Sequence, residues 1–325
     1  MHSAGLPARA AGTAFLIALL FFTPGPAHGL VVEWVGVGAA RGCVEWSDAC
    51  WRHYNVPYEH VRSFGSMLSL VESAPNGVIY VPGGWHPERG WPKDWRARLL
   101  QLPYLRYLGV CAGAYTFSLG SVTYYVNANR WPPVDRWTNG LTVAYGMLGP
   151  GIWAPYRTYV LGDRSGTVLY WNGPLFSPEA GPEVILVGPC RGELYSIPVP
   201  AFIRFTGDLA WTWVLDMRVR IGGVTGWGAA LGVVYDVVRS PSGIRLIEHG
   251  RVVLFGPHPE FAVRTWWMLL RAYEFLTGAW TPPVFNTLKL VAELLLNYGM
   301  AEIGPGDPPH EVERGRVEEG EVVHG

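Results

Sequence analysis

Charged side chains are scarce in this chain of 325 residues: Asp, Glu, Lys and Arg make up 16% of it, whereas a soluble domain typically carries about 25%. The few charges nearly cancel, because 25 Lys and Arg residues stand against 26 Asp and Glu residues and leave a net charge of −1. A protein that binds nucleic acid needs a basic surface, so this balance argues against such a partner. The hydrophobic fraction of 49% excludes a mainly disordered chain.

Cysteine is also scarce, with four residues in all: Cys43, Cys50, Cys111 and Cys190. No two of them form a C-x-x-C pair, so a structural zinc site is not expected, and we predict no metal and no cofactor. On one helix Cys43 and Cys50 would lie two turns, about 10 Å, apart, which is too far for a disulfide. They can pair only in a loop, and pairing with Cys190 stays open. Aromatic residues, by contrast, are abundant, with 16 Trp and 16 Tyr.

The first 29 residues are typical of a secretion signal. Arg9 supplies the positive start, residues 10–22 form a mostly apolar stretch, and a run of small residues follows. The stretch falls short of the roughly 20 residues that a membrane-spanning helix needs. We therefore predict residues 1–29 to be a signal peptide or an N-terminal anchor, and the protein to be secreted or membrane-anchored outside the cytoplasm. A true start near Leu30 is the alternative.

The remaining chain alternates expected strands and helices. Residues 302–325 lack apolar periodicity and are predicted as a disordered tail, which leaves residues 30–301 as the folded domain. Buried strands are expected at 30–38, 77–81, 107–110 and 251–255, and helices at 43–54, 58–73, 95–102, 262–276 and 288–298. A middle segment rich in Gly, Pro and aromatics holds β-like runs at 141–145, 167–171, 183–187, 214–221 and 229–238. This rhythm predicts an α/β fold with an open, mostly parallel sheet, helices on both faces and an inserted β-rich middle.

A nucleophile elbow is predicted at residues 109–115, GVCAGAY. The expected strand ends at Cys111, a nucleophilic residue type, and small residues surround it. Such a strand-to-helix turn exposes its nucleophile at the carboxyl end of the sheet, where a strained and crowded backbone requires small neighbours. A lone cysteine is more often a buried structural residue, but this flanking pattern favours a nucleophile.

A base for this thiol is predicted at His258, in the segment GPHPE that directly follows the expected strand 251–255. Four of the nine histidines lie in the signal or the tail. Among the others only His86 and His258 follow expected strands, and only His258 does so closely, whereas His249 precedes its strand. Glu260 is placed to orient the imidazole, as a third group orients the base of a nucleophile.

Two other histidine segments carry weaker signals. His53 and His60 are separated by Pro57, so they do not share one face of a helix and a metal site there is not expected. His86 and Glu88 follow the Gly-Gly turn, where a solvated loop is the favoured interpretation and a position facing the same pocket is the alternative.

A third segment, VPGG at 81–84, ends the second expected strand. A Gly-Gly turn there can direct a backbone N–H at a developing oxyanion, although alone it indicates no more than a turn. All three segments follow parallel strands, and in open α/β sheets binding sites gather at the carboxyl ends of strands.

These motifs resemble the class I glutamine amidotransferase-like superfamily, and within it the biotin-protein ligase N-terminal domain family. The resemblance spans about residues 30–262 and rests on the elbow, the VPGG turn and LFGPHPE at 254–260. The segment LYWNGPLF at 169–176 is also similar to an aromatic-Asn-Gly segment of that family.

The resemblance implies a flavodoxin-like sheet and a triad in which Cys111 is the nucleophile, His258 the base and Glu260 its orienting partner. The backbone N–H groups of Gly84 and Ala112 would form the oxyanion hole. The expected activity is cysteine-dependent hydrolysis of an amide in an unknown small molecule or peptide. Because no ligase or synthetase domain is recognisable and export is expected, this is favoured at least as much as a glutaminase. A non-catalytic binding module on the same fold is the second hypothesis.

Overall fold

The computed structural model describes the folded body of the chain with several gaps. The residues described are 29–117, 120–125, 136–137, 143–148, 151–158, 161–162, 164–176, 184–187, 194–197, 216–218, 225–282 and 284–299. The predicted signal or anchor (up to residue 28), the predicted tail (302–325) and Cys190 lie outside them. Within the described part, no helix is both long enough and apolar enough to cross a membrane.

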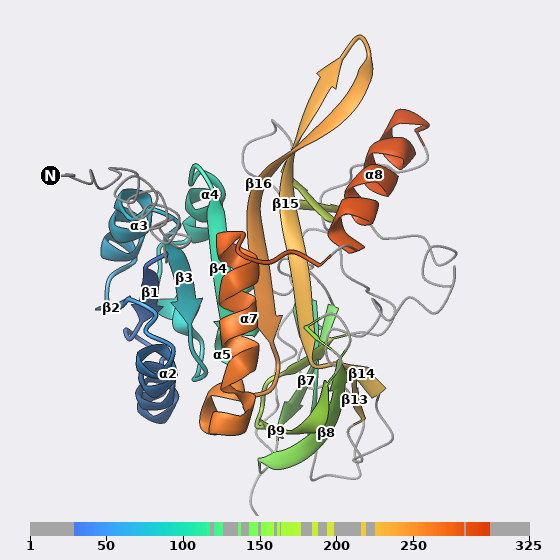
Figure 1. The fold of residues 1–325 in the computed structure, drawn as a ribbon. Coiled ribbons are helices and arrows are strands. Elements are labelled where there is room, and N and C mark those ends of the chain that lie inside the picture. Colours follow the sequence, from blue (N-terminus) through green and yellow to red (C-terminus); the bar gives the residue numbers. More distant parts are fainter. Residues whose placement is uncertain are drawn as a thin grey trace, which may run out of the picture.

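The main sheet has eight strands in the order β12-β11-β15-β16-β4-β3-β1-β2. Its strands are β1 (Val31–Trp34), β2 (Tyr58–Val61), β3 (Val78–Val81), β4 (Leu105–Val110), β11 (Val184–Val187), β12 (Leu194–Ile197), β15 (Ala229–Ser240) and β16 (Gly243–Phe255). All neighbours from β16 to β2 are parallel, as are β11 and β15, while β15–β16 and β11–β12 are antiparallel. The mostly parallel sheet that the sequence predicts is confirmed, and its two antiparallel pairs make it a mixed sheet (Figure 1).

Helices cover both faces of this sheet. They are α2 (Arg41–His53), α3 (Phe64–Ser73), α4 (Trp95–Leu100), α5 (Ala112–Phe117), α7 (Trp266–Thr277) and α8 (Val284–Asn297), with short 3-10 turns η1 (Pro87–Gly90), η3 (Pro259–Phe261) and η4 (Val263–Thr265). On β4, the Tyr107 hydroxyl donates to the Gly113 carbonyl of α5 at 2.8 Å, while the Arg106 guanidinium donates to the Leu276 carbonyl of α7 at 3.1 Å. Adjacent strand residues point to opposite faces, so α5 and α7 lie on opposite sides.

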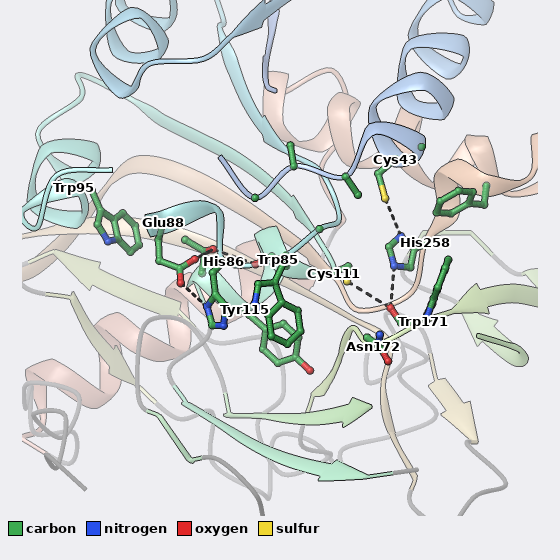
Figure 2. A pocket seen from close by; sticks show the side chains of 18 of the residues that line it. Cys43, Trp85, His86, Glu88, Trp95, Cys111, Tyr115, Trp171, Asn172 and His258 are labelled. Atoms are coloured by element: carbon green, nitrogen blue, oxygen red, sulfur yellow. Dashed lines mark hydrogen bonds and ion pairs between the residues drawn. The ribbon is translucent and has the colours of Figure 1, made fainter. Parts of the chain in front are cut away.

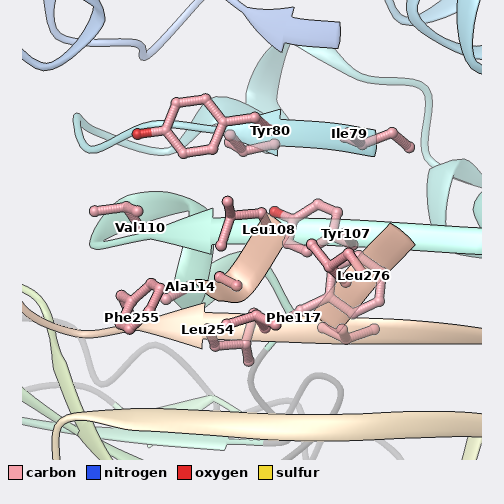
Figure 3. Packing of buried hydrophobic residues seen from close by; sticks show 14 of the residues in the cluster. Ile79, Tyr80, Tyr107, Leu108, Val110, Ala114, Phe117, Leu254, Phe255 and Leu276 are labelled. Carbon is pink, nitrogen blue, oxygen red and sulfur yellow. The ribbon is translucent and has the colours of Figure 1, made fainter. Parts of the chain in front are cut away.

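The core lies between the central strands and these two helices. Every residue of β1 and β3 is buried, as the apolar runs of a sheet covered on both sides require. Figure 3 shows Leu108 and Val110 of β4 beside Leu254 and Phe255 of β16, and the ring centroid of Phe117 in α5 lies 4.2 Å from that of Tyr107 in β4. The ends of β4 and β16 are therefore held firmly, and the segments that follow them begin from a rigid frame.

The middle of the chain builds a second eight-stranded sheet, ordered β6-β5-β7-β10-β14-β13-β8-β9. Its strands are β5 (Gly120–Tyr125), β6 (Arg136–Trp137), β7 (Val143–Leu148), β8 (Ile152–Thr158), β9 (Arg164–Tyr170), β10 (Pro174–Phe176), β13 (Asp216–Arg218) and β14 (Thr225–Trp227). All pairs but β5–β7 are antiparallel. The inserted β-rich segment is confirmed, although the runs at 183–187 and 229–238 belong to the main sheet as β11 and β15.

Two local expectations were wrong. Residues 58–61 form strand β2 beside β1 rather than the start of a helix, and α3 begins only after Ser63, whose hydroxyl accepts from the Ser66 amide at 3.1 Å and caps the helix. The strand expected at 251–255 starts at Gly243, because it forms a long hairpin with β15. His249 consequently lies within β16 and not before it.

Close packing of the elbow gives a first prediction. A Cβ on Gly109 would lie 2.5 Å from the Gly113 carbonyl oxygen, whereas a Cβ on Gly42 of α2 would meet nothing within 4 Å. Gly109→Ala should therefore lower the free energy of unfolding by roughly 1–3 kcal/mol, and Gly42→Ala should raise it by about 0.4–1 kcal/mol. Urea denaturation measures both, and equal effects of the two substitutions would contradict this packing.

Candidate active site

Cys111 stands at the turn between β4 and α5, as the predicted elbow requires. Its φ of +51° is unusual for a residue with a side chain and costs on the order of 1–3 kcal/mol unless the surroundings enforce it. They do so here: the Cys111 amide donates to the Phe255 carbonyl at 2.8 Å, and the Cys111 carbonyl accepts from the Ala114 amide at 3.0 Å. Hydrogen bonds thus hold the peptide groups on both sides of Cys111.

His258 reaches the same edge from β16. Because β16 and β4 are parallel neighbours with Phe255 opposite Val110, the residues that follow them emerge side by side. The His258 amide donates to the Leu169 carbonyl of β9 at 2.7 Å. Its imidazole Nδ1 lies 2.8 Å from the carboxylate of Glu260, and both side chains are buried. The pairing of His258 with Glu260 that the sequence predicts is present in the structure.

One backbone oxygen, the carbonyl of Trp171, joins the thiol to the imidazole. The Cys111 thiol donates to it at 3.5 Å, and Nε2 of His258 lies 3.0 Å from it (Figure 2). Both imidazole nitrogens therefore face oxygen acceptors, a carboxylate at Nδ1 and a carbonyl at Nε2. Only an imidazolium donates from both nitrogens, so this environment favours the protonated ring.

The charges around His258 act in the same direction. Burial alone would lower the pKa of the imidazole, but its electrostatic interactions with Cys111 and Glu260 raise that pKa well above its ordinary value. A group whose pKa is raised by folding stabilises the native state at low pH, and this contribution is lost as the pH rises through the folded pKa. We therefore expect His258 to be an imidazolium in the folded protein around neutral pH.

The two predicted oxyanion donors line the same cavity as Cys111 and His258. Ala112 is the first residue of α5, where backbone N–H groups have no partner within the helix. Gly84 belongs to the turn after β3 and packs so closely that a Cβ would lie 1.8 Å from the Gly38 carbonyl oxygen. Neither of their amides donates to any residue in the described part of the chain. Both are therefore available to a bound oxygen.

The cavity has a volume of about 1020 Å³. Three of its lining residues, His86, Cys111 and Asn172, have positive φ values of 52°, 51° and 57°. Strained backbone of this kind gathers at functional sites, because packing must hold it in place. Glu88 also lines the cavity and lies 2.8 Å from Nδ1 of His86. The favoured interpretation of this segment as a solvated loop was therefore wrong, and the alternative that it faces the pocket is confirmed.

A second cysteine close to His258 was not found from the sequence. Cys43, on the first turns of α2, has its sulfur 3.8 Å from Nδ1 of His258. Burial raises the pKa of Cys43 to about 11, so it is a thiol at neutral pH. It shares its helix with Cys50, and both are unpaired thiols. Cys43 therefore packs against the His258 ring as a neutral neighbour. It does not follow a strand, so the pattern that predicted Cys111 and His258 could not predict it.

Two groups in the described residues bring three metal-ligand atoms within 4.8 Å of one another. In the first, Cys43, His258 and Glu260, the Nδ1 that would bind a metal is already hydrogen-bonded to the carboxylate. In the second, burial raises the pKa of Glu33 well above its ordinary value, which keeps that carboxyl neutral and a poor ligand beside Asp48 and His60. Neither group fits a resident metal as it stands.

The protonation of His258 is directly testable. In ¹⁵N-histidine-labelled protein, long-range ¹H–¹⁵N spectra should show His258 as an imidazolium at neutral pH. Cys111→Ala should lower the pKa of His258, because the electrostatic interaction with Cys111 is the largest of those that raise it. The His258→Gln variant assigns the signal, and a ring that loses its proton below pH 6.5 in the unaltered protein would contradict this electrostatic description.

Comparison with protein-family models and with curated protein sequences gives no match for this chain. The resemblance to the amidotransferase-like superfamily therefore stays a prediction that rests on the motifs and their geometry.

Proposed function

We propose that the protein is a cysteine-dependent amidohydrolase with a Cys111-His258-Glu260 triad, related to the class I glutamine amidotransferase-like superfamily and its flavodoxin-like fold. One observation carries the proposal: the Cys111 thiol and Nε2 of His258 meet at a single carbonyl oxygen, that of Trp171. A nucleophile and a base that share one acceptor are neighbours, and a proton can pass between them. The amidotransferase-like motifs predict the same pair.

The reaction begins from a Cys111 thiolate beside the His258 imidazolium, the pair that forms when the thiol proton passes to the ring. The thiolate attacks the carbonyl carbon of the amide, and the resulting oxyanion accepts from the Gly84 and Ala112 amides. The tetrahedral intermediate collapses as Nε2 of His258 gives its proton to the leaving amine, which leaves a thioester on Cys111. Water then attacks this thioester with His258 as base, and the acid is released.

The surroundings of the triad supply the orientation that this sequence needs. Glu260 holds Nδ1 at 2.8 Å and Trp171 holds Nε2 at 3.0 Å, so the imidazole keeps its plane while its proton moves. The cavity, at about 1020 Å³, is at the upper end of the range for small-molecule sites, roughly 300–1,000 Å³. It has room for a small-molecule or peptide amide, and the predicted signal or anchor would place the reaction outside the cytoplasm.

The binding-module hypothesis has one observation in its favour, which is the same Trp171 carbonyl. It occupies Nε2 of His258, the nitrogen that must accept the proton of Cys111. A pocket that only binds its ligand would tolerate this arrangement without change. Reactivity of the thiol separates the two functions, since only the enzyme needs His258 to activate Cys111.

The proposal predicts selective, His258-dependent alkylation of Cys111. With iodoacetamide at neutral pH, mass spectrometry should find the adduct on Cys111, while Cys50, whose pKa burial raises, stays largely unmodified. His258→Gln should slow the reaction by about 10²-fold or more, the lower range of what a general base contributes. Cys111→Ala should abolish both the adduct and any hydrolysis in a screen of small amides and peptides.

His249→Gln is the matched control, because His249 lies on the same strand and bonds to the Leu100 carbonyl away from the cavity. It should leave the alkylation rate unchanged. Slow labelling of Cys111 that does not depend on His258 would instead support the binding module and contradict the catalytic proposal.

A further inference from the structure

Arg96, on α4, is a cation in the cavity lining that the proposed triad does not use. Its Nε atom is buried and has no hydrogen-bond partner. Among the described residues, no carboxylate or carbonyl accepts from the rest of the guanidinium, whose one resolved contact is with the Trp95 ring at 5.0 Å. Burial lowers the pKa of Arg96 to about 10, so the group still carries its charge at neutral pH.

Arg96 as a whole is half-buried, but its enclosed Nε has lost water without gaining a partner, and proteins normally pair such a charged group. The acid among the described lining residues, Glu88, is already engaged by His86 at 2.8 Å and by the Thr116 hydroxyl at 3.4 Å. A second cation, the exposed Lys93, lines the same cavity, and no ion pair among the described residues involves it. This part of the cavity therefore carries positive charge that the described protein does not neutralise.

The position of this charge relative to the triad is informative. Figure 2 shows Trp95, the ring beneath Arg96, at one end of the lining and Cys111 with His258 at the other, with His86 and Tyr115 between them. A ligand that reaches both ends must be extended. Its reacting amide would lie at Cys111 and a remote group would lie at the cations.

We propose that Arg96, assisted by Lys93, binds a carboxylate at the end of the substrate remote from the amide that Cys111 attacks. The guanidinium offers the planar, two-pronged donor set that matches a carboxylate, and a carboxylate is the anion that peptides and acylated amino acids carry. This inference rests on the proposed function for the position of the reacting amide. It narrows the substrate to acidic amides, and Arg96 acts as a specificity-determining residue.

A pair of probes that differ in one charge tests the subsite by binding alone. N-succinyl-Ala-Ala-amide and N-acetyl-Ala-Ala-amide share their reacting end, and only the first carries a remote carboxylate. Calorimetry on the full chain bearing Cys111→Ala, which cannot turn either over, should give roughly ten- to hundredfold tighter binding of the succinyl probe, as expected for a charge-assisted pair. Adding Arg96→Gln should remove this preference and leave the acetyl probe unaffected.

Arg98→Gln on the same helix is the matched control, because Arg98 is exposed and pairs with Asp94 at 2.9 Å away from the cavity. It should keep the full preference. Equal affinity for the two probes, or loss of preference in the Arg98 variant as well, would overturn the proposal. Displacement of the succinyl probe by inorganic phosphate, with phosphate bound more tightly, would identify a phosphate site and overturn the carboxylate assignment.

Stability gives a second measurement. Removal of a half-buried cation whose Nε is enclosed and unpaired relieves its desolvation cost, so Arg96→Met should unfold at the same temperature as the unaltered protein or higher. A variant that fails to fold would show Arg96 to be structural and overturn the proposal. Failure of the triad and failure of the subsite are distinguishable. Alkylation of Cys111 that does not depend on His258, with the preference for the succinyl probe intact, would contradict only the catalytic proposal. Equal rates of hydrolysis of the two amides would contradict only the carboxylate subsite.

Discussion

The candidate site depends on one interaction, the parallel pairing of β4 with β16. Val110 lies opposite Phe255, and the Cys111 amide extends this ladder by donating to the Phe255 carbonyl at 2.8 Å. Parallel neighbours end at the same edge of a sheet, so Cys111 and His258 meet without a long loop to position either. A slip of one residue would turn one strand's side chains to the opposite face, and thiol and imidazole would no longer share an acceptor. The buried core on both sides of these strands fixes the register.

The second sheet completes what this pairing begins. Leu169, at the end of β9, forms an isolated bridge with His258, and the chain then presents the Trp171 carbonyl to the imidazole. Close approach fixes this connection, because a Cβ on Gly173 would lie 1.7 Å from the Gly256 carbonyl oxygen. The insertion therefore adds an acceptor to the site and a wall to the cavity. Its role is to hold the ring of His258 from the side that the main sheet does not reach.

The sequence predicted the parts of the site whose signal is local. Cys111 and His258 each follow a buried strand directly, and Glu260 is two residues beyond its partner, so residue type and position were sufficient. The contribution of Trp171 was beyond such reasoning, because it is a backbone carbonyl, which every residue possesses. Cys43 comes from a helix whose packing only the tertiary structure reveals. The misplacement of His249 has a related cause: the β15–β16 hairpin extends the strand through polar residues that carry no apolar pattern.

The scarcity of charge gives weight to each ionisable group inside the fold. In the described part of the chain two glutamates are fully buried, and one oxygen of each has a partner: Glu33 accepts from the Ser47 hydroxyl at 2.5 Å, and Glu260 lies 2.8 Å from Nδ1 of His258. Burial raises the pKa of Glu33 well above its usual range, so that acid needs no counterion, and Glu260 has one in the imidazolium. Arg96 has no counterion among the described residues, and it cannot become neutral, because a guanidinium keeps its charge. A fold that neutralises its buried acids internally, yet leaves this cation facing a cavity, draws the missing negative charge from a ligand.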